Sequence, residues 1–244
     1  MKKALVAVVA VGVLLGAEVV AAMRRDYLST EPALEIGGEF GPATGSELDL
    51  IVLGDSTAAG VGAGTPANAY PTLLARRLAQ DGRRVHLTGL GVSGAKVKDV
   101  LDEQAPAAGA LSPDLIFVGI GANDTTHLTP LSEVSADMGR VLDLLLKSGA
   151  TVVVAGAPDM RAAAFWEPLR SITGWRGRQV ADVIEVEARS RGVAVVPLAE
   201  RTGSFFGADP DEHYSADLFH PSPRGYERWA DAIFPVLERA LADE

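Results

Sequence analysis

The stretch LDLIVLGDSTAAGVGAG, residues 48–64, decides the fold. It begins as a continuous apolar run and then changes abruptly to small residues around the tripeptide Gly54-Asp55-Ser56. Such a run is typical of a strand covered on both faces, as in a parallel sheet. The tripeptide is typical of a tight turn, but a serine at a strand end can also expose its hydroxyl as a nucleophile. The remainder of the chain discriminates between these interpretations.

Short apolar runs alternate with amphipathic segments over the rest of the chain. Five strands are predicted, at residues 48–53, 84–90, 114–120, 151–155 and 193–198. Helices are predicted over residues 70–82, 129–149 and 177–191, and a last helix begins at Ser222-Pro223. Thr129 is the expected N-cap of the second helix, with Pro130 at its first position. This alternation predicts a doubly wound, three-layer α/β/α domain with a five-stranded parallel sheet over residues 48–244.

Composition excludes several classes of protein. The chain has 244 residues, a formal net charge of −10 and no cysteine. A strongly acidic chain is a poor partner for nucleic acid, because phosphate binding needs a cationic face. The lack of cysteine excludes disulfides, thiolate zinc sites and a cysteine nucleophile.

Residues 1–25 form a segment of their own. Two lysines precede an apolar run over residues 4–23, which only Glu18 interrupts, and two arginines follow it. The run is long enough to be a membrane anchor, and it also fits a cleaved secretory signal; a buried helix is the third alternative. The leading lysines predict that the following domain lies outside the cytoplasm. Residues 26–47, rich in Gly, Pro, Ser and Thr, are predicted to be a linker.

Polar residues follow the predicted strands. The carboxyl ends of parallel strands meet at one edge of a sheet, where ligands bind. Each strand end therefore brings its following residues to that edge: Asp55 and Ser56, Ser93 and Gly94, Asn123 and Asp124, Asp159, and finally Asp217 and His220.

Ser56, His220 and Asp217 are the predicted catalytic residues. A serine hydroxyl is inert until a base takes its proton, and a neutral imidazole suits that task. Asp217 lies three residues before His220, a spacing that can return its carboxylate to one ring nitrogen while the other faces Ser56. The alternative for His220 is a surface histidine beside the last helix.

The predicted oxyanion hole combines three donors. These are the backbone N–H of Ser56, the backbone N–H of Gly94 and the side-chain amide of Asn123. Gly94 has no side chain to keep a substrate away. Asp55, beside the nucleophile, is expected to hold the turn through hydrogen bonds to loop amides.

The three other histidines are not predicted to be catalytic. His86 is expected within a strand, His127 could line the pocket, and His213 is expected in a solvated loop. The acidic loop over residues 207–217 lacks the spacing of a calcium loop and is also expected to be solvated. No metal site is predicted.

Taken together and in this order, the motifs resemble the four sequence blocks of the SGNH, or GDSL-type, hydrolases. The blocks are Gly54-Asp55-Ser56, Gly94 within VSGA, Gly121-Ala122-Asn123-Asp124 and Asp217-Leu218-Phe219-His220-Pro221. The resemblance implies a flavodoxin-like fold and ester hydrolysis through an acyl-serine, with the residue roles given above and no cofactor. Two positions depart from the family pattern: Thr57 replaces the leucine of GDSL, and Gly91 stands where many members have asparagine. The Gly-x-Ser-x-Gly elbow of the α/β-hydrolases is absent.

The resemblance leaves the substrate open. Lipid esters and acylated carbohydrates are both compatible with it, as is an acyltransferase that passes the same acyl group to an alcohol. A non-catalytic, membrane-tethered module of the same fold is the alternative from another class. Residues 159–179 are rich in aromatic residues and arginines. In one interpretation the aromatic residues form an apolar acyl wall or a flexible cap, and the arginines bind an anionic head group. In the other, the aromatic residues pack the helix onto the sheet and the arginines are solvated. The expected partner is a small-molecule ester, and the expected location is extracytoplasmic, either anchored or secreted.

Overall fold

The computed structural model describes the backbone of residues 2–242 and the side chains of residues 12–242. Within these residues, six strands form one sheet in the order β1-β3-β2-β4-β5-β6. β1 runs antiparallel to β3, whereas all other neighbouring strands are parallel. The strands are β1 Gly37–Phe40, β2 Ser46–Gly54, β3 Arg83–Gly89, β4 Leu115–Gly119, β5 Thr151–Ala155 and β6 Ala194–Val196.

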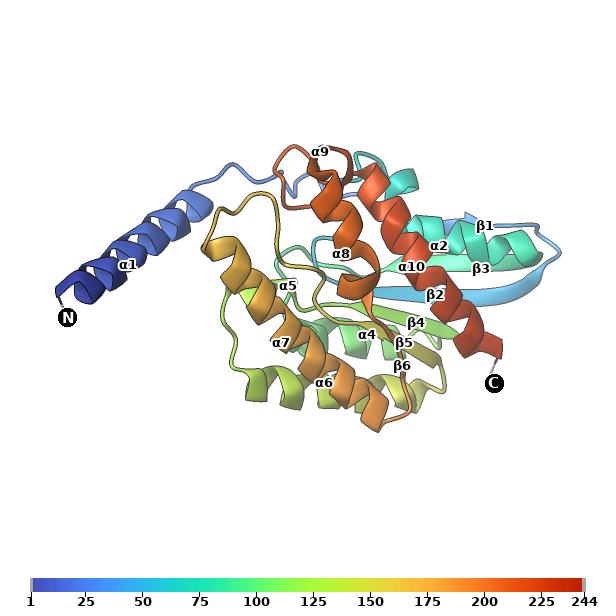
Figure 1. Ribbon diagram of the computed structural model, residues 1–244. Coiled ribbons are helices and arrows are strands. Elements are labelled where there is room, and N and C mark those ends of the chain that lie inside the picture. The colour runs from blue at the N-terminus through green and yellow to red at the C-terminus, as the bar shows by residue number, and fades with distance from the viewer. Residues whose placement is uncertain (1, 243–244) are drawn as a thin grey trace.

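Helices cover both faces of the sheet, which gives the predicted three layers (Figure 1). The α-helices are α1 Lys2–Met23, α2 Tyr70–Leu78, α3 Val97–Asp99, α4 Ala105–Gly109, α5 Ala122–Thr126, α6 Leu131–Leu145, α7 Leu169–Ser190, α8 Leu198–Ala208, α9 Pro210–His213 and α10 Pro223–Ala242. Shorter helical turns are η1 Pro66–Asn68, η2 Ala79–Asp81, the π-type turn η3 Val100–Gln104, and η4 Leu146–Ser148.

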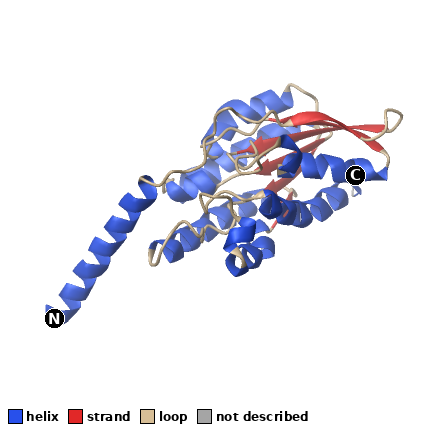
Figure 2. Cartoon of the chain, turned by 90° about the horizontal axis from the view of Figure 1, so that it is seen from above, coloured by secondary structure: helices blue, strands red, loops and turns tan. Residues whose placement is uncertain are grey.

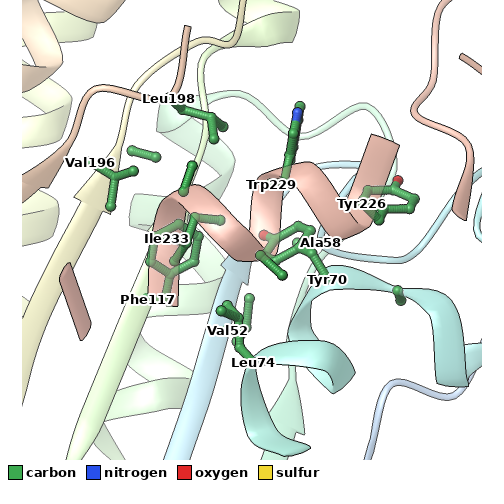
Figure 3. Close-up of a cluster of buried hydrophobic side chains, with 14 of the residues drawn as sticks. Val52, Ala58, Tyr70, Leu74, Phe117, Val196, Leu198, Tyr226, Trp229 and Ile233 are labelled. Atoms are coloured by element: carbon green, nitrogen blue, oxygen red, sulfur yellow. The ribbon is translucent and has the colours of Figure 1, made fainter. Parts of the chain in front are cut away.

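Successive residues of the central strands point into two separate cores. Leu50 and Val52 of β2 face α2 and α10, and they join the cluster around Tyr70, Trp229 and Ile233 shown in Figure 3. Their neighbours in the strand face α6 and α7 on the opposite side of the sheet. Burial on both faces is the reason that the strands are continuously apolar instead of alternating.

The predicted linker and the five-strand prediction both need correction, because residues 26–47 contain β1. Gly37–Phe40 pairs with β3 at the edge of the sheet. With two glycines and no β-branched residue in four positions, this strand lacks the usual composition signal. The strand forms only because its backbone pairs with β3, for example Gly37 with Thr88 and Phe40 with Val85. These partners are far away in the sequence, so local composition does not reveal the strand.

Several helices also differ from the prediction. Helix α6 begins at Leu131, because Pro130 has ψ 133° and lies outside the helical region; Thr129 is therefore not the N-cap. Helix α7 begins at Leu169, well before the predicted residue 177. Its glycines at 174 and 177 lie where the helix approaches the side chains of Arg161 and Met160 too closely for a Cβ. Helices α8 and α9 were not predicted.

Helix α1 points away from the sheet, as Figures 1 and 2 show. Within the part of the chain that the structure describes, no helix combines the length and apolar character needed to cross a membrane. The first eleven residues of the predicted anchor or signal fall outside the described side chains. The alternatives for residues 1–25 remain predictions.

Candidate active site

The nucleophile turn follows β2 directly. Gly54 ends the strand with φ 151°, and a Cβ at this position would collide with the carbonyl oxygen of Gly119 on β4. Only glycine tolerates both conditions. The chain then makes one helical turn, in which the Ala59 N–H donates to the Asp55 carbonyl at 3.0 Å. Ser56 therefore lies in a single helical turn, in agreement with the tight turn that the tripeptide predicts.

A residue that the sequence analysis missed holds the end of β2 in place. Gln104 is buried, with its Oε1 accepting from the Gly54 N–H at 2.8 Å and its Nε2 donating to the Gly54 carbonyl at 2.9 Å. The side-chain amide thus pairs with Gly54 as a neighbouring strand would. No local feature of the sequence marks this glutamine, because its partner lies 50 residues away.

The predicted catalytic residues come together with hydrogen-bonding geometry. His220 Nε2 lies 3.0 Å from Ser56 Oγ, and His220 Nδ1 lies 2.7 Å from Asp217 Oδ2. All three residues are buried. The arrangement is that of a nucleophile, a base and the acid that orients the base. The alternative of a surface histidine is excluded by this burial.

Asp217 is held as a carboxylate. Its Oδ1 accepts hydrogen bonds from the backbone N–H groups of Phe219 and His220, each at 3.0 Å. Burial by itself raises the pKa of this carboxyl, but the His220 ring and the two backbone donors outweigh it and lower the pKa to about 2. The residue can therefore stay charged opposite an imidazolium.

Asp55 is the second buried carboxyl beside Ser56. Its Oδ1 accepts from the Thr57 backbone N–H at 3.0 Å and from the Thr57 hydroxyl at 2.8 Å. Burial raises the pKa of Asp55, and the hydrogen bonds from Thr57 oppose this only in part. The expectation that Asp55 holds the turn agrees with these contacts.

Asn123 connects two of the predicted oxyanion donors. Its Nδ2 donates one hydrogen bond to the carbonyl of Ala95 at 2.9 Å, in the loop that carries Gly94. An amide NH₂ carries two hydrogens, so one remains for a substrate oxygen. Gly94 has φ 84°, in the region that favours glycine, and it is exposed at the edge of the sheet.

Asp124 supports the same loop from below. Its Oδ2 accepts from the Val97 N–H at 3.0 Å, and burial raises the pKa of this carboxyl against the effect of that bond. Asp124 lies at the predicted edge of the sheet, but no role was predicted for it. Its observed role is to join the segments after β3 and β4.

Two hollows lie near these residues and differ in size and lining. A cavity of about 40 Å³ is lined by Ser56, Asn123 and His220, together with apolar side chains that include Phe206 and Trp229. A second hollow of about 720 Å³ lies against residues 28–34, 59–62 and 64, and its lining does not include Ser56, Asn123 or His220. The small cavity is therefore the one that contacts the reacting groups.

The remaining histidines lie away from this cavity. His86 is in β3, as predicted. His127 is exposed, and its Nδ1 pairs with the carbonyl of Asn123 at 2.9 Å. His213 is only 3% exposed, so its prediction as a solvated residue is wrong. Its ring packs against Phe206 with centroids 5.6 Å apart, a contact between two helices that local sequence does not reveal.

The aromatic residues before and within α7 do not form the acyl wall, and most of them do not pack on the sheet either. Phe165 is buried, and its ring lies 5.8 Å from that of Phe219, next to the catalytic histidine. Trp166, Ile172 and Trp175 are exposed by 69%, 40% and 55%, so they are neither packed on the sheet nor inside the cavity.

The nearby arginines bind their own chain. Arg161 pairs with Asp159 at 2.5 Å, and Arg176 donates to the carbonyl of Thr129. Arg170 donates to the carbonyl of Phe165 at 2.8 Å. These contacts use three guanidinium groups to fix loops, although the Arg161 side chain also stays 56% exposed, as the alternative of solvated arginines predicts. Among the described residues, no group of three His, Cys, Asp or Glu side chains is arranged to hold a metal ion.

The fold is that of the flavodoxin-like α/β/α hydrolases, and Ser56, His220 and Asp217 lie together at the carboxyl edge of its sheet. The chain belongs to the GDSL-like lipase/acylhydrolase family, whose sequence model matches residues 52–228.

Three known proteins illustrate the likeness. The GDSL-like esterase Rv1075c of Mycobacterium tuberculosis is 33% identical over 201 residues, which cover 81% of this chain and 64% of that protein. An arylesterase of Vibrio mimicus is 30% identical over 112 residues, covering 43% of this chain and 52% of the relative. The chain thus spans less than two thirds of the length of either relative. The crystal structure of TesA matches 79% of this chain and 99% of its own, with TM-score 0.65 and 22% identity, a likeness of fold.

Proposed function

We propose that this protein hydrolyses carboxylic esters through an acyl-enzyme on Ser56. The observation that carries the proposal is the continuous hydrogen-bonded line from Ser56 Oγ to His220 Nε2 at 3.0 Å and from His220 Nδ1 to Asp217 at 2.7 Å. The family membership and the esterase names of two relatives support it. A non-catalytic module has no physical need for a buried aspartate–histidine pair aimed at a serine.

The proposed cycle has two halves. His220 Nε2 takes the proton of Ser56 as Oγ attacks the ester carbonyl, and the negative charge on the carbonyl oxygen is met by the free N–H of Asn123 and the backbone N–H groups of Ser56 and Gly94. The imidazolium, stabilised by the Asp217 carboxylate, gives the proton to the departing alkoxide. In the second half His220 activates water, which attacks the acyl-serine and releases the acid.

The cavity size favours a short acyl group. About 40 Å³ beside Ser56 is far below the several hundred Å³ of pockets that enclose large ligands. A short acyl group such as acetyl fits this space, whereas a fatty chain would have to extend out of it. We therefore favour acylated carbohydrates or other short-chain esters over long-chain lipids.

A series of p-nitrophenyl esters from acetate to decanoate tests this function with the full chain. We expect kcat/KM to be highest for acetate and to fall as the chain lengthens. In Ser56→Ala, kcat should fall on the order of 10³-fold or more, while the melting midpoint stays close to wild type. Equal rates in the two proteins would remove the nucleophile, and a preference for decanoate would remove the acyl-size argument. Added alcohol acceptors separate hydrolysis from acyl transfer through the products formed.

We also propose that the enzyme works outside the cytoplasm, anchored or secreted. Support comes from the sequence of residues 1–25, in which lysines precede a long apolar run. Fractionation of expressing cells tests the location. Full-length protein in the membrane fraction supports an anchor, a shortened protein in the medium supports a signal, and full-length protein in the cytosol contradicts both.

A further inference from the structure

Residues 25–36, here called the N-terminal strap, connect α1 to β1 across the carboxyl edge of the sheet (Figure 1). At its far end the strap is fixed to the sheet, because the Gly89 N–H donates to the carbonyl of Ile36 at 2.9 Å and Ile36 is buried. At its near end it lies on the loop that carries the catalytic aspartate. The strap precedes residues 52–228, the part of the chain that the family model matches.

The strap supplies a hydrogen bond to the catalytic carboxylate itself. The backbone N–H of Leu28 donates to Asp217 Oδ2 at 3.2 Å, on the same oxygen that accepts from His220 Nδ1. The other oxygen accepts the Phe219 and His220 N–H groups. Of the four donors, the Leu28 N–H alone comes from outside the catalytic loop. Since each donor fixes one direction of the carboxylate, the strap limits its rotation.

Arg25 holds the backbone of the same loop. Its Nε donates to the carbonyl of Asp217 at 2.9 Å, and its Nη1 donates to the carbonyl of Ala164 at 3.4 Å. The guanidinium thus joins the catalytic loop to the segment before α7. The Ala164 N–H also donates to the carbonyl of Leu218 at 2.9 Å, so these two segments form one connected unit beneath the strap.

The loop that Arg25 contacts contains a strained residue. Leu218 has φ 57°, a conformation that costs free energy for a branched side chain with no glycine-like freedom. Such a residue persists only where its surroundings hold it, and here it follows Asp217 directly. Tyr27 adds an apolar contact, with its ring 5.4 Å from that of Phe219.

From these contacts we propose that the N-terminal strap is a positioning element of the active site, in which Arg25 and the Leu28 N–H fix Asp217 against His220. This inference rests on the proposed ester hydrolysis. No strap residue lines the small cavity at Ser56, whereas residues 28–34 line the larger hollow. The proposal assigns the strap to the orientation of the base and not to the binding of the acyl group. Its loss should therefore lower kcat and leave KM nearly unchanged.

Two neighbouring arginines provide a matched test in the full chain. Arg25→Met removes both hydrogen bonds to the loops, whereas Arg24→Met makes the same change of charge and shape on an exposed side chain. With p-nitrophenyl acetate, we expect kcat of Arg25→Met to fall about tenfold with KM within about twofold, and Arg24→Met to match wild type. Arg25→Lys, which keeps a donor, should recover part of the loss.

A second pair at position 28 tests the backbone donor independently. Leu28→Pro lacks the N–H that reaches Asp217, and Leu28→Ala keeps it while losing the side chain. We expect a fall in kcat of about tenfold for the proline variant and little change for the alanine variant. This pair decides the question if Arg25→Met proves too unstable to assay.

The failures are distinguishable. Activity that survives Ser56→Ala contradicts the proposed function. Loss of activity in Ser56→Ala, together with wild-type kcat in both Arg25→Met and Leu28→Pro, keeps the function and overturns the positioning role. An increase in KM at unchanged kcat also overturns it, because it would place the strap in substrate binding.

Discussion

Asp217 and Asp55 lie on two loops at the same edge of the sheet, and both are buried near Ser56. Their pKa values nevertheless shift in opposite directions. Asp217 accepts hydrogen bonds from four donors, and its pKa is lowered to about 2 although burial opposes this. Asp55 accepts from Thr57 alone among the described contacts, and burial raises its pKa. The stronger desolvation of Asp55 and the larger number of donors to Asp217 together give the two carboxyls opposite pKa shifts.

The largest effect is expected on kcat when the Asp217 carboxylate is removed. Asp217→Asn replaces the carboxylate by an amide that cannot stabilise an imidazolium and favours the wrong tautomer of His220. We expect kcat for p-nitrophenyl acetate to fall on the order of 10³- to 10⁴-fold. Asp211→Asn, an exposed acid a few residues earlier, is the control. A fall of less than about tenfold would contradict the assignment of Asp217.

The turn of Asp55 should respond mainly in stability. Gln104→Leu leaves the buried N–H of Gly54 without its partner just before this turn. We expect the free energy of unfolding to fall by about 3 kcal/mol, measured by chemical denaturation. Glu103→Leu changes the exposed neighbour and should have little effect. Equal unfolding free energies for these two variants would mean that Gln104 does not hold the strand end.

The pH dependence of stability sharpens the comparison for Asp217. Its pKa is about 2 in the folded protein against an ordinary 3.8, so its ionised form stabilises the fold above the ordinary value. This contribution, about 2 kcal/mol, is lost as the pH falls through the folded value. The difference in unfolding free energy between wild type and Asp217→Asn should therefore grow from pH 2 to about pH 4. A difference that does not change over this window would contradict the lowered pKa.

The smallest effect on kcat is expected for the Asp55→Asn variant. Asn keeps an oxygen that can accept from Thr57, so kcat of Asp55→Asn should stay within about threefold of wild type. The pH dependence of stability should have the opposite sign to that of Asp217. Because the pKa of Asp55 is raised in the folded protein, its contribution to the free energy of unfolding declines as the pH rises above the ordinary aspartate value. The stability difference between wild type and this variant should shrink over that range. A large loss of kcat would make Asp55 part of the chemistry.

Local sequence predicted the parts of the site that depend on strand ends. Ser56, Asn123 and His220 each follow or lie near a recognisable apolar run or helix start, and parallel strands bring such residues to one edge. Gln104, β1 and the strap escaped prediction because their roles are defined by distant partners. His213 was assigned to solvent because its neighbours in sequence are acidic, whereas packing against α8 buries it.

The sequence by itself determined the doubly wound class and the candidates for the nucleophile, base and acid, because apolar periodicity and the order of polar strand ends are local properties of the chain. Only the tertiary structure decided the size of the cavity at Ser56, the opposite tendencies of the two buried aspartates and the contact of the strap with Asp217. These depend on which groups meet across separations as large as 192 residues, and both burial and the number of hydrogen-bond donors arise only where such segments meet.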